Sequence, residues 1–213
     1  MEAFLITEPF HHIVFRNFFT EEELELVWKE IDLISRPGVF LSPLETGAAH
    51  EEDQKPLSKR SAVFLDLLYI YNRSLSPILS FNRKIFEEGV INPEESWFFK
   101  NLAIRRDDTL LSYYEDGDYY EPHCDESALT GLTWIFKEPK AFQGGDLLFS
   151  DYSYSIECEY NSGVIFPSQI KHAVYPVKMA EDMKGKKMGR YCVTSLMYPD
   201  RRKLENQKQI QIR

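Results

Sequence analysis

Apolar residues recur at helical spacing early in the chain and at strand spacing in much of the rest. Thr20 and Glu23 have the spacing of a capping box, in which each side chain bonds the backbone N–H of the other residue. The apolar positions that follow predict a helix over residues 21–34: Leu24, Val27, Trp28, Ile31 and Ile34. The β-branched and aromatic run at residues 11–18 predicts a strand before this helix.

Three further stretches of the first half have weaker patterns. Residues 61–71 are apolar enough for a strand or a buried helix, and their spacing does not separate the two. Residues 75–86 have helical spacing, and Gly89 closes this predicted helix. Residues 42–59 are polar and lack an apolar period, which leaves two interpretations open: a mobile linker, or a lid over a site.

From residue 97 onwards the pattern is that of short strands separated by turn residues. Residues 97–104 and 109–114 are predicted strands, with Asp107 and Asp108 at the turn between them. The further predicted strands are 129–136, 147–149, 154–160, 164–166, 173–177 and 191–198. Helices followed by such strands indicate an α+β, mainly β fold: a double-stranded β-helix, or jelly roll, with N-terminal helices supporting one face.

The length favours one domain over residues 1–213. We divide it into helical support at about 20–90, a jelly-roll core at about 97–198 and a basic tail at 200–213. The net charge of −9 disfavours a nonspecific grip on phosphates, so we expect no nucleic acid partner and interpret the basic tail as solvated. No run of about 18 apolar residues occurs, and residues 1–4 lack the layout of a secretion signal. We therefore expect a cytoplasmic protein with no membrane partner; its oligomeric state stays open.

The cysteines and histidines supply the candidate chemistry. Cys124, Cys158 and Cys192 are too widely spaced for a disulfide framework or a Cys-x-x-Cys zinc site. His123 and Asp125 point to the same side if their backbone is extended, so one imidazole and one carboxylate converge. A second histidine from a distant strand would complete a facial triad, which suits a non-haem Fe(II) oxygenase. Cys124 between the pair is then expected to face the other way and to be buried.

The His-x-Asp pair belongs to an ordered set of motifs. Tyr114, Gly117 and Tyr120 precede it at fixed spacing, and downstream follow the blocks Gly-Gly-Asp-Leu (144–147), Gly163, His-Ala-Val (172–174) and Gly-Arg (189–190). Over about residues 108–198 this set resembles the prolyl-4-hydroxylase-like branch of the Fe(II)/2-oxoglutarate dioxygenases. The resemblance implies that His123, Asp125 and His172 hold Fe(II) and are the catalytic residues. It also implies 2-oxoglutarate as cosubstrate and O2, with ascorbate as a reductant.

The resemblance further implies a site for 2-oxoglutarate. Arg190 is the expected partner of the far carboxylate, since a guanidinium can grip a carboxylate bidentately. Tyr114 matches a family tyrosine that touches the cosubstrate, and Thr133 is a candidate hydroxyl donor. Arg190 follows His172 by 18 residues, whereas the family gap is about nine to eleven, so we interpret residues 178–189 as an enlarged hairpin loop between paired strands. This departure leaves Lys178 as an alternative cation.

The implied reaction is hydroxylation of an unactivated C–H bond, with release of succinate and CO2. A peptidyl residue such as proline, in a protein or peptide, is the substrate most typical of this branch. A free amino acid or other small molecule is the alternative on the same scaffold. Two other classes also stay open: a non-catalytic metal-binding jelly roll, and a cupin-like metalloenzyme that uses Mn or Zn.

Overall fold

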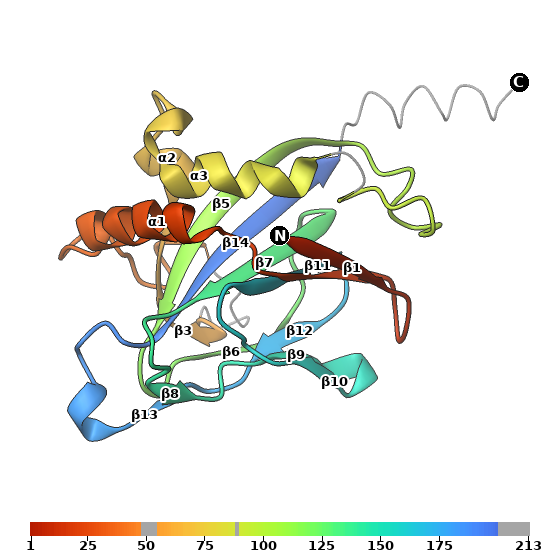
Figure 1. Ribbon diagram of the computed structural model, residues 1–213. Helices are drawn as coiled ribbons and strands as arrows, with labels where there is room; N and C mark the ends of the chain where they lie inside the picture. The colour runs from red at the N-terminus through yellow and green to blue at the C-terminus, as the bar shows by residue number, and fades with distance from the viewer. Residues whose placement is uncertain (48–54, 88–89, 200–213) are drawn as a thin grey trace, which may run out of the picture.

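The computed structural model describes residues 1–47, 55–87 and 90–199, and it contains two facing β-sheets with helices over one of them (Figure 1). The larger sheet has seven strands, all paired in antiparallel fashion. In sheet order they are β1 (Glu2–Ile6), β2 (His12–Arg16), β11 (Ser162–Pro167), β7 (Leu129–Ile135), β14 (Arg190–Pro199), β5 (Ile104–Tyr114) and β4 (Ser61–Phe64).

The smaller sheet has five short strands and lies against the face of the larger sheet that the helices leave free. Its strands, in sheet order, are β10 (Tyr154–Ile156), β9 (Leu147–Phe149), β12 (His172–Val174), β6 (Tyr119–His123) and β3 (Ser58–Lys59). A separate pair joins β8 (Phe142–Gln143) to β13 (Lys178–Met179). This is the predicted mainly β jelly roll with N-terminal helical support.

The helices pack on the outer face of the larger sheet. They are α1 (Glu21–Ile34), α2 (Leu65–Leu68) and α3 (Pro77–Phe81), with the 3-10 turns η1 (Arg73–Leu75) and η2 (Asn82–Phe86). Two further 3-10 turns lie elsewhere: η3 (Ser150–Tyr152) joins β9 to β10, and η4 (Glu181–Met183) lies between β13 and β14. The bounds of α1 are those predicted, and the capping box is formed: Glu23 N–H donates to Thr20 Oγ1 at 3.3 Å, and Thr20 N–H donates to Glu23 Oε2 at 2.9 Å.

Two apolar clusters fill the two sides of the larger sheet. Val27 and Ile31 of α1 pack with Val193 of β14 on the helical side. Trp134 of β7 and Phe149 of β9 pack between the two sheets. Successive side chains of β7 point to opposite faces of the sheet. Because both faces are covered, all seven residues of this strand are buried. Facing is therefore set by register, and it decides which side chains can reach a site between the sheets.

The strand predicted at 97–104 does not form, and Asp107 and Asp108 do not make a turn. Residues 97–101 are turns, because the Asn92 amide donates to the carbonyls of Phe99 and Leu102 at 2.9 and 2.8 Å and so takes the place of a neighbouring strand. Strand β5 instead runs without a break through both aspartates.

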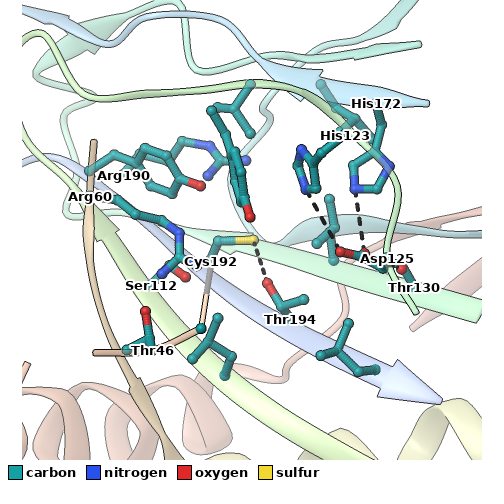
Figure 2. Close-up of a pocket in the computed structure, with 18 of the residues that line it drawn as sticks. Thr46, Arg60, Ser112, His123, Asp125, Thr130, His172, Arg190, Cys192 and Thr194 are labelled. Carbon is teal, nitrogen blue, oxygen red and sulfur yellow. Dashed lines mark hydrogen bonds and ion pairs between the residues drawn. The ribbon is translucent and has the colours of Figure 1, made fainter. Parts of the chain in front are cut away.

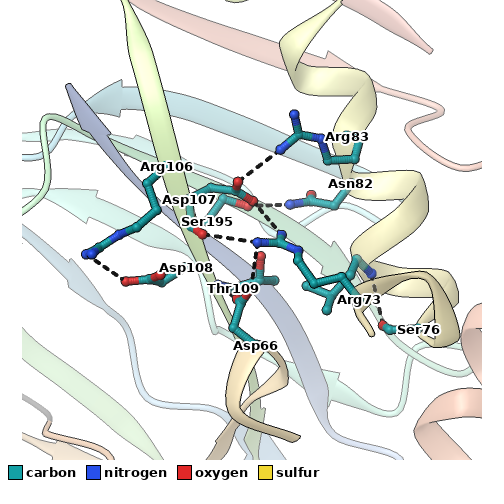
Figure 3. A network of polar contacts seen from close by, with 11 residues as sticks. Asp66, Arg73, Ser76, Asn82, Arg83, Arg106, Asp107, Asp108, Thr109 and Ser195 are labelled. Atoms are coloured by element: carbon teal, nitrogen blue, oxygen red, sulfur yellow. Dashed lines mark hydrogen bonds and ion pairs between the residues drawn. The ribbon is translucent and has the colours of Figure 1, made fainter. Parts of the chain in front are cut away.

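Asp107 is accommodated inside β5 by two arginines from the helical segment (Figure 3). Its carboxylate is almost fully buried and accepts from Arg73 Nη2 at 2.9 Å and from Arg83 Nη1 at 3.0 Å. Arg73 also pairs with Asp66 at 2.6 Å. These ion pairs allow Asp107 to lie within a strand, whereas the two adjacent aspartates alone had indicated a turn.

Other predicted bounds are corrected by the structure. Residues 61–71 contain both of the alternatives, strand β4 followed by helix α2. The helix predicted from residue 75 is divided between α3 and η2. Its expected end at Gly89 lies outside the described residues, as does the basic tail. The predicted strand 154–160 ends at Ile156.

The predicted hairpin between 173–177 and 191–198 is wrong. Strand β12 pairs with β6 and β9 in the smaller sheet, whereas β14 pairs with β5 and β7 in the larger one. Residues 178–189 therefore cross from one sheet to the other, and they contain β13 and η4.

Candidate active site

Three potential metal ligands converge at one end of a pocket between the sheets (Figure 2). His123 ends β6 and His172 begins β12, and the two residues are directly paired across these strands. Asp125 Oδ1 lies 3.7 Å from His123 Nε2, and its Oδ2 lies 3.4 Å from His172 Nε2. All three ligand atoms lie within 4.8 Å of one another, which is the spacing that one bound ion needs.

Asp125 does not reach the site by strand alternation, because β6 ends two residues before it. Its position comes from the neighbouring loop: Asp125 N–H donates to the Ser168 carbonyl at 3.1 Å, and the Gln169 amide donates to the Asp125 carbonyl at 3.1 Å. For the same reason Cys124 is exposed and lies 3.4 Å from the Gln169 carbonyl, which corrects the prediction that it is buried.

Backbone carbonyls fix both imidazoles in the orientation that a metal ligand requires. His123 Nδ1 lies 2.8 Å from the Glu121 carbonyl, and His172 Nδ1 lies 2.9 Å from the Ile170 carbonyl. A carbonyl can only accept, so each Nδ1 carries a proton, and each Nε2 faces the space beside Asp125 as the ring atom available to a metal. Burial, followed by the neighbouring His172, lowers the pKa of His123 to about 4, which keeps this imidazole neutral.

A chain of hydroxyl groups supports the Asp125 carboxylate from behind. Thr130 Oγ1 donates to Asp125 Oδ2 at 2.5 Å, and Ser168 Oγ lies 2.8 Å from the hydroxyls of both Thr130 and Ser127. Burial acts to raise the pKa of Asp125, but the imidazoles and the Thr130 hydroxyl outweigh burial and hold this pKa below its ordinary value. The residues thus offer two imidazole nitrogens and one carboxylate, the donor set of a facial triad with open positions.

The larger sheet forms the floor of the pocket, and its pairing explains which residues line it. Arg190 of β14 is paired with Tyr114 of β5. Strand β4 lies on the other side of β5, with Ser61 opposite Tyr113, so the same register continued by one residue sets Arg60 opposite Tyr114. Arg60, Tyr114 and Arg190 thus form one row across three adjacent strands, and all three line the pocket.

Arg190 is buried without a counterion. Only 1% of its surface is exposed, and none of its three guanidinium nitrogens has a hydrogen-bond partner among the described residues. Its Cζ lies 4.8 Å from the centroid of the Tyr114 ring. Burial raises the pKa of the neighbouring Cys158 thiol to about 11, so this thiol stays protonated and supplies no negative charge. A buried, unpaired guanidinium that lines a pocket fits the far carboxylate of a bound dicarboxylic acid.

Gly145 makes room for Arg190. A Cβ at this position would lie 2.8 Å from Arg190 Cδ, and the φ of +77° is one that side chains rarely adopt. The Gly-Gly motif therefore leaves room for a pocket residue, which its sequence did not indicate.

The remaining predicted cosubstrate residues separate into two groups. Tyr114 lines the pocket, and burial raises its pKa to about 12, so it offers a neutral hydroxyl group. Thr133 does not line the pocket: its neighbours Leu132 and Trp134 pack between the sheets, so Thr133 faces the helical side, beside Val193. Lys178 is exposed on β13 and is also absent from the pocket lining.

Several pocket residues were not foreseen from the sequence. Arg60 is the most notable of them, and Thr130 is another; the Ser168 hydroxyl, which was not foreseen either, lies behind Thr130 and does not itself line the pocket. Thr46 and Gly47, within the polar stretch 42–59, also line the pocket, while residues 48–54 lie outside the described residues. The lid hypothesis therefore stays a prediction. Alternation along β7 could have revealed Thr130, had the register of β7 been known.

Comparisons with known proteins agree with this arrangement. Residues 109–198 match the family model of the 2OG-Fe(II) oxygenase superfamily. A prolyl hydroxylase from Trichoplax adhaerens, solved in complex with a hypoxia inducible factor peptide fragment, is similar with a TM-score of 0.61 and 14% identity, over 88% of this chain and 83% of that one.

Two other solved structures are similar at comparable levels. A Pseudomonas putida prolyl-4-hydroxylase has a TM-score of 0.51 and 13% identity, over 89% of this chain and 92% of that one. NgTET1 in complex with 5mC DNA has a TM-score of 0.51 and 12% identity, over 97% of this chain and 84% of that one. At such identities the likeness establishes the fold. No curated protein sequence matches the chain significantly.

Proposed function

We propose that this chain, whose residues 109–198 match the family model of the 2OG-Fe(II) oxygenase superfamily, hydroxylates an unactivated C–H bond of a peptidyl residue such as proline. The protein is a 2-oxoglutarate-dependent dioxygenase that uses Fe(II) and O2. One observation carries the proposal: three converging ligand atoms lie at one end of a pocket whose other end holds a buried arginine without a partner.

Each residue has a distinct task in this reaction. His123, Asp125 and His172 would hold Fe(II) on one side and leave its other positions free. The bound metal, with 2-oxoglutarate and O2, supplies the oxidant, and 2-oxoglutarate leaves as succinate and CO2. Arg190 would fix the far carboxylate of the cosubstrate, with the neutral Tyr114 hydroxyl beside it. The apolar side chains of Leu110 and Leu132 line the same pocket and limit the access of water.

A peptide is the substrate that the observations favour among the classes known for this fold. The structurally similar Trichoplax adhaerens enzyme was solved with a peptide, and the similar NgTET1 structure contains DNA, so the fold alone does not separate the two. The net charge of −9 disfavours a phosphate backbone and supports a peptide. Within the described residues, no helix is long and apolar enough to cross a bilayer. We also propose a cytoplasmic location, which the free thiols support.

The proposal is tested by succinate release and by product mass. Purified protein is supplied with Fe(II), 2-oxoglutarate, ascorbate and a peptide library in which proline and other residues are varied. We expect succinate release that a subset of peptides stimulates, together with a gain of one oxygen atom in those peptides. The His123→Ala variant should show neither. Succinate release that no peptide stimulates, but a free amino acid does, would transfer the function to the small-molecule class.

A further inference from the structure

The pocket holds a second buried arginine that the metal and the cosubstrate leave unused. Arg60 is 7% exposed, and its Nη1 has no hydrogen-bond partner among the described residues. None of the ion pairs found in the described chain includes it. A buried guanidinium without an anion is costly, so its retention inside a pocket calls for a ligand.

Arg60 lies close to the reaction centre. Its Cζ is 5.4 Å from the centroid of the Tyr120 ring, and that ring stacks on His123 with 3.6 Å between centroids, so Arg60 Cζ lies within about 9 Å of the His123 ring. A group held by Arg60 would therefore be within a few bonds of an atom placed at the metal.

Arg60 and Arg190 are suited to separate anions. They lie on opposite sides of Tyr114, on strands two positions apart in the sheet, which sets their Cα atoms about 10 Å from each other. Each guanidinium also contacts a tyrosine of its own, Arg190 over Tyr114 and Arg60 over Tyr120. One molecule of 2-oxoglutarate would pair its far carboxylate with Arg190 and direct its keto-acid end to the metal. Arg60 would then still lack an anion.

Polar groups accompany Arg60 on its side of the pocket. Figure 2 shows Arg60, Ser112 and Thr46 together, away from the triad. Among the described residues that line the pocket, Asp125 is the one carboxylate, and it is already engaged by Thr130 and by the two imidazoles. Within the described part of the chain, the Arg60 side of the pocket thus presents a cation and hydroxyl groups but no negative charge.

We propose that Arg60 binds a carboxylate of the substrate that is hydroxylated. The substrate class is then a molecule with a carboxylate a few bonds from the oxidised carbon. In a peptide this group is an acidic side chain or a terminal carboxylate next to the target residue; in a free acid it is the molecule's own carboxylate. The inference rests on the proposed function, because it concerns the substrate of the same pocket.

Binding to protein loaded with Mn(II) and saturating 2-oxoglutarate tests this assignment without turnover. One set of probes is N-acetylated proline, leucine and lysine, each as the free acid and as the carboxamide. A second set is end-blocked peptides that carry Asp or Asn directly after a proline. Isothermal titration gives the affinity of every probe for the wild type and for Arg60→Gln, Arg60→Lys and Lys59→Gln. Lys59 is the matched control, because it is the exposed neighbour and pairs with Asp118 at 3.1 Å.

We expect acidic probes in at least one set to bind about 10- to 100-fold more tightly than their amides, the effect of a charge-assisted hydrogen bond. Arg60→Gln should abolish this preference, Arg60→Lys should keep part of it, and Lys59→Gln should keep all of it. The set that responds identifies the source of the carboxylate.

Two results would overturn the assignment. One is that no acidic probe in either set binds more tightly than its amide. The other is that Arg60→Gln weakens 2-oxoglutarate binding as much as Arg190→Gln does, which would place Arg60 on the cosubstrate. Thermal unfolding of each variant verifies that it is folded. Because binding is measured without turnover, a failure here is distinct from a failure of the dioxygenase assay.

Discussion

The two ends of the pocket differ in how their polar groups are satisfied. At the triad end, each imidazole Nδ1 has a carbonyl acceptor, and the Asp125 carboxylate has the Thr130 hydroxyl. At the arginine end, Arg190 has no hydrogen-bond partner among the described residues, and neither has Arg60 Nη1. The triad end is therefore fully supported by hydrogen bonds, whereas the arginine end holds cations that lack an anionic partner among the described residues and are suited to pair with bound ligands.

This difference has consequences for stability as well as for binding. A supported metal site costs little in the metal-free protein, because each imidazole Nδ1 has a carbonyl acceptor and the carboxylate has a hydroxyl donor. A buried, unpaired guanidinium destabilises the unliganded protein, and an anion that pairs with it relieves that cost. Ligand binding at the arginine end should therefore stabilise the fold, and the substitutions below separate the two ends.

Removal of a triad ligand should have the largest effect. In His172→Ala one nitrogen ligand is lost, so we expect turnover to fall to background and Fe(II) affinity to fall with it. Succinate release and a metal titration with Mn(II) measure the two quantities. The arginine end is untouched, so the variant should remain folded; turnover near the wild-type level would remove His172 from the metal site.

Removal of the Arg190 guanidinium should weaken the binding of 2-oxoglutarate rather than the binding of the metal. We expect Arg190→Gln to raise the Kd of 2-oxoglutarate about 10- to 100-fold, because a charge-assisted pair is lost, and to leave Mn(II) affinity within about twofold. Isothermal titration measures both affinities. The same variant should unfold at a higher temperature than the wild type when no ligand is present, and it should lose the stabilisation by 2-oxoglutarate. Equal affinity for 2-oxoglutarate in the two proteins would contradict the role of Arg190.

The hydroxyl behind Asp125 should have a smaller effect, confined to the triad end. Thr130→Val removes the donor to Asp125 Oδ2, and the loss of such a support typically costs about tenfold in metal affinity. Thr133→Val is the matched control, because it makes the same chemical change on the same strand but on the face toward the helices. Metal titration should therefore separate the two variants, and equal losses would show that the effect is one of packing.

The triad end should also respond to pH, whereas the arginine end should not. The pKa of His123 lies at about 4, below its ordinary 6.5, so the unfolded chain takes up a proton between these pH values that the folded, metal-free protein does not. The free energy of unfolding is then unaffected above pH 6.5 and decreases as pH falls toward 4, by at most about 1.4 kcal/mol per pH unit. Urea unfolding in the presence of a chelator measures this slope. His123→Gln should make it shallower, and an unchanged slope would argue against this origin.

Sequence reasoning located the triad residues because each belongs to a short motif, and it identified the fold because strand and helix spacing are local. It failed where partners are distant. Asp107 lies within a strand because arginines from the helical segment neutralise it, and the sequence around Asp107 does not show them. Arg60 precedes a four-residue strand whose partner begins some forty residues later, so only the register of β4 and β5 brings it to the pocket.

The sequence also did not show which face of the sheet each side chain points to. Thr133 was a candidate hydroxyl donor to 2-oxoglutarate and so was expected to face the pocket, but residues on both faces of β7 are buried, so burial and composition do not distinguish the two faces. The same limit affected the cation. The 18-residue gap between His172 and Arg190 had left Lys178 as an alternative cation, and the strands on either side of this gap were assumed to pair, which they do not.

Lys178 provides the smallest predicted effect and a direct test of that correction. Its side chain is exposed on β13, which pairs with β8 outside the pocket, whereas Arg190 is buried in the row with Tyr114. We therefore expect Lys178→Gln to change the Kd of 2-oxoglutarate by less than about twofold, since an exposed charge outside the pocket is screened by water and salt. Arg190→Gln, measured in parallel, is the positive control. A loss of cosubstrate affinity in Lys178→Gln equal to that in Arg190→Gln would mean that the loop after β12 turns inward when the ligand binds. Lys178 would then have to be included among the residues that bind the far carboxylate of 2-oxoglutarate.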